Sequence, residues 1–284
     1  MAPPAVRPME ARDADAVHYV SVAAFADLAR RLGEPPEPPP PVEGARLRVG
    51  RVQRTDPGGA WVAERDGEVV GASLGIVREG LWGLSLLVVR PDAQSSGIGR
   101  ELLDRAHAYA DGAHGRVVLA SPDPRALRSY ARLGLAMHPA VRALGRPRNV
   151  AMPPEVRPGT RADLPLTVLV DRAVRGAAHG EDVGALLDLG GKMLVLDERG
   201  YAIVRDGTVR ILAATDEAAA ATLLRGCLAA AGPSDALVEW ITSAQGWAIA
   251  PCLDAGLDLR MDGAVFLAGD VGPFAPYLPN GAYL

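Results

Sequence analysis

The chain has 284 residues, of which 49% are hydrophobic and 23% are charged, so one large domain or two smaller ones with sizeable cores are expected. No apolar run reaches the roughly 18 residues of a membrane-spanning helix, and no apolar signal segment precedes the first acidic residues, so we expect a cytoplasmic protein without a membrane partner. The net charge of −4, and a densest basic stretch (142–149) without aromatic residues, argue against nucleic acid as a partner.

Strand and helix patterns alternate through the first half of the chain, separated by clear turn signals. The predicted elements are a strand at 6–9, a helix at 14–32, a proline-rich extended loop at 33–44, a helix at 45–54, a hairpin at 60–77 that turns at Asp66–Gly67, a strand at 81–90, a glycine turn with an amphipathic helix that ends at Asp111–Gly112, a strand at 116–120, a helix at 124–133 closed by Gly134, and a strand at 135–144.

The glycine turn has the sequence QSSGIG at 94–99, with its two glycines where a helix begins. A dinucleotide fingerprint needs a third glycine where Leu102 stands, and a P-loop needs a lysine that this segment lacks. Backbone amides at a helix N-terminus bind anions, and Gly97 and Gly99 leave room for a close approach. The turn is therefore predicted to hold a pyrophosphate, with Arg100 adding a charge-assisted contact. An ordinary glycine-rich turn is the alternative.

Two parts of the chain resemble each other. VRPMEARDADAV from Val6 returns as VRPGTRADLPLTV from Val156, and the segment 121–135 aligns without a gap with 243–257. A proline-containing connection at 149–156 separates the copies. This pattern predicts two domains, 1–148 and 149–284, whereas chance similarity between alanine-rich segments is the alternative.

The remaining composition offers no metal or disulfide chemistry. Cys227 and Cys252 lack the spacing of a zinc site or a disulfide framework, so both are expected to be reduced and buried. His107 and His114 are seven residues apart without a third ligand, so no metal site is predicted. Lys192 is the single lysine of a chain rich in Ala, Gly and Pro, which suggests a GC-rich, bacterial genome.

The succession of the strand LSLLVVRP, the turn QSSGIG, a helix, the strand RVVLA and the segment ALRSYARLGL resembles the GNAT superfamily of N-acetyltransferases. The family pattern is [Q/R]-x-x-G-x-[G/A], followed by a motif that ends Y-x-x-x-G-F. Leu135 stands where phenylalanine is common, and Asp123 where asparagine often touches the cofactor. The resemblance implies an α/β (α+β) fold of two tandem units, each a mixed, mostly antiparallel sheet flanked by helices, the second a degenerate copy.

The resemblance also implies acetyl-CoA as the cofactor and a direct transfer to an amine. The backbone of Leu87, Val88 and Val89 would lie along the pantetheine arm, and a strand amide around Val88 would stabilise the oxyanion. Tyr130 would protonate the leaving thiolate. The residues implied for the pyrophosphate are Gln94, Ser95, Ser96, Gly97, Ile98, Gly99 and Arg100, with Asp123 as a further cofactor contact.

Several of these residues also have a structural interpretation. Asp123 is a favoured residue type for capping the helix that opens at Pro124, and Tyr130 is as well suited to packing as to catalysis. His138, Glu64 and Glu79 are weak candidates for a general base, and the sequence singles out none of them.

The second copy replaces the residues that would bind the cofactor. In the gapless alignment, Gly97 and Gly99 become Ala219 and Ala221, Gln94 and Ser95 become Asp216 and Glu217, and Tyr130 becomes Cys252. Carboxylates repel a pyrophosphate, so a catalytically silent second copy is expected. The proline-rich ending at 272–284 is predicted to be extended and docked, and we hypothesise that the carboxylate of Leu284 lies near the active site of the first copy.

The predicted function is an acetyl-CoA-dependent N-acetyltransferase that acts on a small amine or a peptide amino group. A non-enzymatic acyl-CoA sensor or scaffold, or an acyltransferase for a longer acyl chain, are the alternatives. The sequence leaves the acceptor, the general base and the oligomeric state open.

Overall fold

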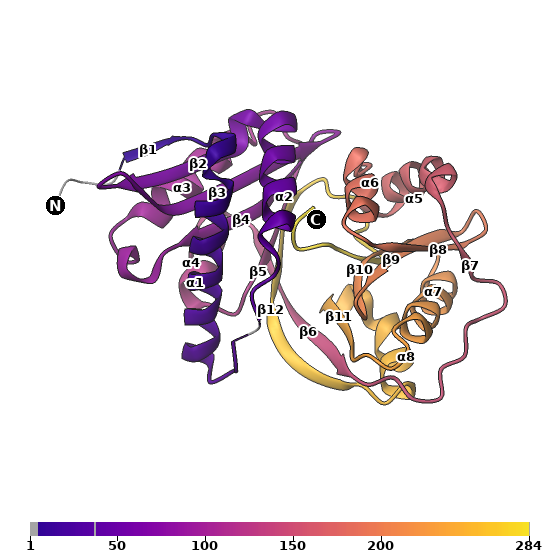
Figure 1. Ribbon diagram of the computed structural model, residues 1–284. Coiled ribbons are helices and arrows are strands. Elements are labelled where there is room, and N and C mark those ends of the chain that lie inside the picture. The colour runs from indigo at the N-terminus through magenta and orange to yellow at the C-terminus, as the bar shows by residue number, and fades with distance from the viewer. Residues whose placement is uncertain (1–4, 37, 284) are drawn as a thin grey trace. The chain divides into compact units, whose positions relative to one another are not determined.

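The computed structural model describes residues 5–36 and 38–283 (Figure 1), so the hypothesis about Leu284 lies outside the described residues. Contacts between residues divide the chain into two compact units. Unit 1 contains the chain through Val77 together with Trp82–Ala113, and unit 2 contains Arg78–Leu81 and His114–Leu284. Among the described residues, no helix combines the length and the apolar character needed to cross a bilayer.

Unit 1 is a strand meander with helices from both ends of its sequence. The strands lie in the order β1-β2-β3-β4, and β1 and β3 are both antiparallel to β2. Its elements are β1 (Ala5–Pro8), α1 (Ala14–Leu32), α2 (Val42–Thr55), β2 (Ala60–Arg65), β3 (Glu68–Arg78), β4 (Leu81–Val89) and α3 (Ile98–Ala108).

The predicted elements of unit 1 are confirmed to within a few residues, because their ends carry strong local signals. Asp66 and Gly67 both have a positive φ, as a tight hairpin turn between right-twisted strands requires. Helix α1 ends at Gly33 in the left-handed conformation, which glycine adopts without a steric cost.

The sheet of unit 1 has a core on each face. Leu86 and Val88 of β4 point into a cluster with residues of α1 and α2, whereas Leu87 and Val89 pack against a separate cluster that includes Ile98 and Leu102 of α3. This alternation fixes which side chains of β4 face which helices.

Unit 2 holds the rest of the chain around one mixed sheet. Its strands lie in the order β5-β12-β6-β11-β10-β9-β8-β7, with only β10 and β11 parallel, and β13 also pairs with β10. Its elements are β5 (Gly115–Ala120), α4 (Pro124–Arg132), β6 (Ala136–Gly145), β7 (Arg157–Pro158), α5 (Leu164–Arg175), α6 (Glu181–Asp188), β8 (Lys192–Leu196), β9 (Gly200–Arg205), β10 (Thr208–Ala214), α7 (Glu217–Ala230), β11 (Ala236–Ile241), α8 (Ile249–Asp254), β12 (Asp258–Gly269) and β13 (Tyr277–Leu278).

The two copies exchange their last strands. Strand β12 ends the second copy but pairs with β5 of the first, as in the register of Val265 with Leu119. Strand β6 ends the first copy but pairs with β11 of the second, and β6 and β12 also pair with each other. The exchange places residues 114–148 in the same compact unit as the second copy.

This exchange explains why the compact units differ from the predicted domains, 1–148 and 149–284. Compact units follow contacts, and strands β5 and β6 find their partners in the second copy. The predicted boundary separates similar sequences, and as a boundary between duplicated copies it stays a prediction.

The same local clamp occurs at the start of both copies. Asp13 accepts hydrogen bonds from the guanidinium of Arg7 (2.8 Å) and from the Glu10 amide (2.8 Å). Asp163 accepts the equivalent bonds from Arg157 (2.6 Å) and the Thr160 amide (2.8 Å). Both clamps lie directly before a long helix. This shared interaction supports the predicted duplication, and hydrophobic patterning does not encode it.

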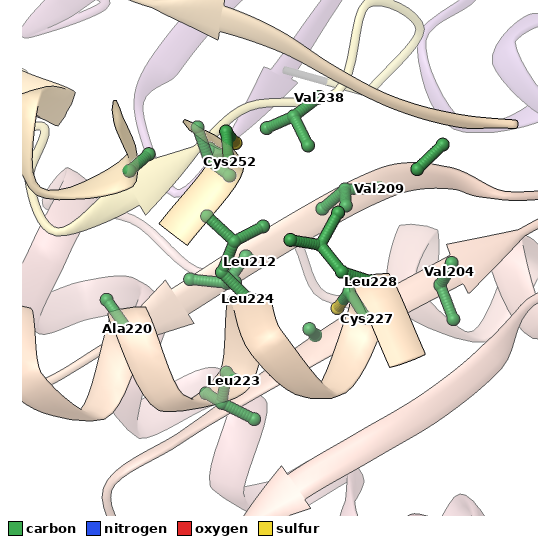
Figure 2. Packing of buried hydrophobic residues seen from close by; sticks show 14 of the residues in the cluster. Val204, Val209, Leu212, Ala220, Leu223, Leu224, Cys227, Leu228, Val238 and Cys252 are labelled. Carbon is green, nitrogen blue, oxygen red and sulfur yellow. The ribbon is translucent and has the colours of Figure 1, made fainter. Parts of the chain in front are cut away.

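The core of the second copy is built around α7. Figure 2 shows Leu224 and Leu228 of this helix directed toward Leu212 and Val209 of β10. Cys227 and Cys252 lie in the same cluster, and both are free and buried as predicted. Burial in this apolar core raises the pKa of each thiol to about 12, so neither is a reactive thiolate.

The turn between β3 and β4 belongs to unit 2 and is bound by other residues of that unit. The carboxylate of Glu79 accepts hydrogen bonds from the guanidinium of Arg172 (3.0 Å) and the amide of Ala178 (2.8 Å). Arg78 forms an ion pair with the buried Asp182 (2.5 Å). Glu79 is therefore a structural carboxylate, which removes the reason for considering it as a general base.

The ion pair of Glu79 predicts a loss of stability in acid. Its hydrogen bonds with Arg172 and Ala178 lower the carboxyl pKa from 4.5 to about 2. Because the folded-state pKa is depressed, this stabilisation is complete above pH 4.5 and is lost as the pH falls toward 2. Glu79→Gln should lower the free energy of unfolding at neutral pH by less than about 1 kcal/mol, since the pair is solvent-screened. The melting temperature of this variant should also depend less on pH below 4.5. The exposed Glu155→Gln variant is the control, and an acid limb unchanged in Glu79→Gln would contradict the assignment.

Candidate functional site

Strand β4 leads into the glycine turn through a short 3-10 segment, Pro91–Ala93. The side-chain amide of Gln94 donates to the carbonyl of Val89 (2.9 Å), and the hydroxyl of Ser96 donates to the carbonyl of Ala93 (2.6 Å). These two predicted pyrophosphate residues therefore hold the turn in shape with their side chains. Contact with a phosphate would fall to the backbone.

The turn reverses sharply enough to need left-handed backbone at two positions. Ser95 has φ 62° and Gly97 has φ 90°, and Gly97 is the N-cap residue of α3. A side chain built on Gly97 would meet nothing within 4 Å, so the corner is open, and one on Gly99 would lie 3.5 Å from Val89 Cγ2. Glycine at 97 thus satisfies the backbone conformation and keeps the helix end uncovered.

The first amides of α3 are not capped by a side chain. Gly97 has none, and its carbonyl accepts from the amides of Arg100 and Glu101 (3.1 Å each) as the helix begins. The amides of Ile98 and Gly99 precede the first complete helical turn, so they have no intrahelical acceptor. Uncapped N–H groups at the positive end of a helix dipole are favourable for binding an anion.

Arg100 is available to add a charge at this corner. Its side chain is 88% exposed and forms a loose i,i+4 pair with Asp104, whose carboxylate is 3.8 Å from the guanidinium. Such a pair is worth at most a few tenths of a kcal/mol, about 0.3–0.5, so a phosphate oxygen would compete for the guanidinium with little penalty.

The corresponding end of α7 in the second copy is closed. Its N-cap, Asp216, turns its own carboxylate onto the amide of Ala219 (2.9 Å) and pairs with Arg199 (2.8 Å). The pair with Arg199 lowers the pKa of Asp216, so the carboxylate stays charged. A carboxylate on this helix end repels a phosphate, and Ala219 is fully buried where Gly97 is open.

Tyr130 lies on α4 in unit 2. The ring is 6% exposed and packs edge-to-face on Phe266, with the ring centroids 5.7 Å apart. Burial raises the pKa of the phenol above its ordinary value, so the hydroxyl is protonated at neutral pH. A protonated hydroxyl is the form that a proton donor requires, although the raised pKa makes it a weaker acid. The predicted counterpart, Cys252, is fully buried in the core.

Asp123 is the N-cap of α4. Its carboxylate accepts from the amide of Arg125 (2.9 Å) and pairs with the guanidinium of the same residue (2.8 Å). The structural interpretation accounts for this side chain, and its contact with a cofactor stays a prediction.

Glu64 and His114 have structural partners. Glu64 accepts a hydrogen bond from the Arg7 guanidinium (2.9 Å). The ring nitrogens of His114 face the carbonyls of Asp270 (2.8 Å) and Glu79 (3.0 Å). In the part of the chain that the structure describes, no three His, Cys, Asp or Glu side chains form a group suited to a metal ion.

A contact that the sequence did not indicate joins α2 to the middle of β4. The guanidinium of Arg48 donates to the hydroxyl of Ser85 (2.8 Å) and also to the carbonyl of Ser85. Arg48 stands in a helix with four arginines, so nothing in its sequence context distinguishes it from the solvent-facing ones.

Comparison with known proteins identifies the segment that carries this turn. The family model of the acetyltransferase (GNAT) domain matches residues 56–134, from the loop before β2 to Gly134. Residues 56–134 are thus similar to a GNAT acetyltransferase domain. The match includes both the glycine turn and Tyr130, so the resemblance noted in the sequence is confirmed.

A mycothiol acetyltransferase of Streptomyces avermitilis is 39% identical over 88 residues. This similarity covers 29% of the chain and 29% of that enzyme, so the matched region spans less than a third of the relative's length.

Solved structures extend the similarity to the whole chain at the level of the fold. A crystal structure from Pyrococcus horikoshii, assigned to the acetyltransferases, is similar over 99% of this chain and 95% of its own, with a TM-score of 0.78 at 15% identity. A tandem GNAT protein from the clavulanic acid biosynthesis pathway is similar over 94% and 99%, with a TM-score of 0.59 at 16% identity. The predicted fold, two tandem GNAT-like units with mixed, mostly antiparallel sheets, is confirmed.

The open corner predicts different effects on coenzyme binding for alanine at Gly97 and alanine at Gly112. Gly97→Ala forces a side chain into a left-handed backbone, at a cost of roughly 1 kcal/mol, and covers the free amides. Gly112→Ala has the same backbone problem (φ 77°) with nothing within 4 Å, at the other end of the same helix. Both variants should lose similar thermal stability, but only Gly97→Ala should bind coenzyme A at least tenfold more weakly in a calorimetric titration. Equal coenzyme affinity in the two variants would contradict the site.

Proposed function

We propose that this protein is an acetyl-CoA-dependent N-acetyltransferase whose acceptor is a small amine or a peptide amino group. The observation that carries the proposal is the uncapped start of α3, where Gly97 and Gly99 leave backbone amides open inside a GNAT domain. Acetyltransferases of this superfamily draw the acetyl group from acetyl-CoA, and the open amides suit its pyrophosphate.

Helix α3 and strand β4 would bind different parts of the coenzyme. The amides of Ile98 and Gly99 would hold the pyrophosphate, and the exposed Arg100 would add a charged contact. The backbone of β4 at Leu87–Val89 would align the pantetheine arm. The side chains of Leu87 and Val89 are held against the α3 cluster and that of Val88 against the opposite core, which keeps this strand rigid.

The chemistry is a single acyl transfer. Acetyl-CoA supplies the thioester, and attack by the nitrogen of a neutral amine forms the amide while the C–S bond breaks. A backbone amide near Val88 would stabilise the negative charge on the carbonyl oxygen. Tyr130 of the family motif is proposed to protonate the thiolate, and the proton that leaves the new amide passes to solvent or to a base not yet identified.

A non-enzymatic acyl-CoA sensor is the second candidate. The burial of Tyr130 and its raised pKa favour it to the extent that a buried phenol is a poor proton donor. The two candidates share the coenzyme site and differ only in turnover.

Thiol release across a panel of small amines and peptides separates the two functions. Acetyl-CoA should give free coenzyme A at a rate that depends on one class of acceptor. Tight coenzyme binding without thiol release for any acceptor would instead favour the non-enzymatic sensor. The same assay with propionyl-CoA and longer acyl-CoA compounds defines the acyl chain.

Tyr130→Phe tests the proposed acid. Loss of the hydroxyl should lower kcat roughly 10²-fold, at the low end of the range for a positioned proton donor, and leave the affinity for acetyl-CoA within about twofold. The ring still packs on Phe266, so the melting temperature should be nearly unchanged. Unchanged kcat would remove Tyr130 from the mechanism.

A further inference from the structure

The end of the chain docks on the second copy through aromatic and apolar side chains. After β12, the described residues 270–283 contain no helix, as predicted from the prolines of this segment (Figure 1). Phe274, Tyr277, Leu278 and Tyr283 are between 0% and 4% exposed. Leu278 belongs to the cluster around α7, and the other three belong to the cluster on the other side of the sheet. The segment is therefore integrated into both cores.

The strand in this segment fills a gap in the sheet. Strand β9 covers one edge of β10 along its whole length, Thr208–Ala214. On the other edge, β11 pairs with β10 only at Thr208 and Leu237. Strand β13 pairs with Leu212 and Ala213 on that second edge and also contacts β11. Strands β10 and β11 thus diverge after one residue pair, and β13 occupies the wedge between them.

Polar groups of the wedge meet the backbone of the segment. The amide of Ala214 donates to the carbonyl of Pro276 (3.2 Å), and the buried side-chain amide of Gln245 donates to the carbonyl of Phe274 (2.7 Å). In the other direction, the side-chain amide of Asn280 donates to the carbonyl of Arg210 (2.9 Å). These bonds recognise an extended peptide rather than particular side chains.

One side chain of the segment is recognised specifically. The Tyr277 hydroxyl lies 2.9 Å from His179 Nε2, and His179 Nδ1 lies 2.7 Å from the Asp171 carboxylate. All three side chains are at most 1% exposed. Asp171 also accepts from the hydroxyl of Tyr201 (2.6 Å). A chain of buried hydrogen bonds that ends on Tyr277 leaves unpaired polar groups when the tyrosine hydroxyl is removed.

We propose that the wedge between β10 and β11 is a peptide-strand binding site whose ligand is the chain's own segment 271–283. By position in the repeat, β10 corresponds to β4, which carries Leu87–Val89 in the first copy. In the second copy, the edge of this strand is occupied by a strand of peptide. The binding of the segment is independent of whether the first copy turns over acetyl-CoA.

A truncated chain and a synthetic peptide test the site directly. A chain that ends at Gly269 should bind a fluorescent peptide of residues 270–284 and regain the melting temperature of the intact chain. The intact chain, with its site filled, should bind the peptide at least tenfold more weakly. A peptide with Tyr277→Phe should bind the truncated chain about fivefold to tenfold more weakly, as expected for one buried hydrogen bond. Folded truncated chain that does not bind the peptide would overturn the proposal.

Hydrogen exchange on the full chain keeps the proposal testable if the truncated chain does not fold. In Tyr277→Phe, the amides of Ala214 and Leu278 should exchange at least fivefold faster, while those of α7 keep their protection. Tyr109→Phe is the matched control, since it removes a hydroxyl near Asp56 (3.4 Å) in unit 1. Unchanged protection at Ala214 in Tyr277→Phe would overturn the proposal. Neither readout uses the coenzyme, so failure of the proposed acetyl transfer would leave both results interpretable.

Discussion

The first amides of a helix have no acceptor within the helix, and the two copies in this chain differ in what these amides face. Asp216 caps α7 with its own carboxylate, whereas Gly97 leaves the start of α3 to solvent or to an anion. A substitution that removes one cap costs only about 1 kcal/mol, so a helix of 11 residues tolerates the open end. The proposed coenzyme site depends on that small local cost.

The second copy keeps the fold while losing the features of a site. Its equivalents of Gly97 and Tyr130, Ala219 and Cys252, are fully buried, and its β10–β11 wedge is filled by β13. Each change adds apolar contact where a ligand would need open space. The same copy supplies partners for β5 and β6 and binds the turn at Glu79.

Local features were predictable from the sequence, and long-range pairing was not. The turn at Asp66–Gly67, the end of α1 at Gly33 and the sequence of the glycine turn are written in neighbouring residues. The exchange of β6 and β12 is not, because an apolar strand suits several neighbours and the choice is made by packing far along the chain. The contact between Arg48 and Ser85, 37 residues apart, and the seating of β13 escaped prediction for the same reason.

The most direct test of the account is to follow the backbone amides of the intact protein by NMR during a titration with coenzyme A. We predict saturation at one molecule per chain, with the largest shifts at the amides of Gly97, Ile98 and Gly99 and none at Ala219. A second equivalent of bound coenzyme with shifts at Ala219, or saturation that leaves Gly97–Gly99 unperturbed, would contradict it.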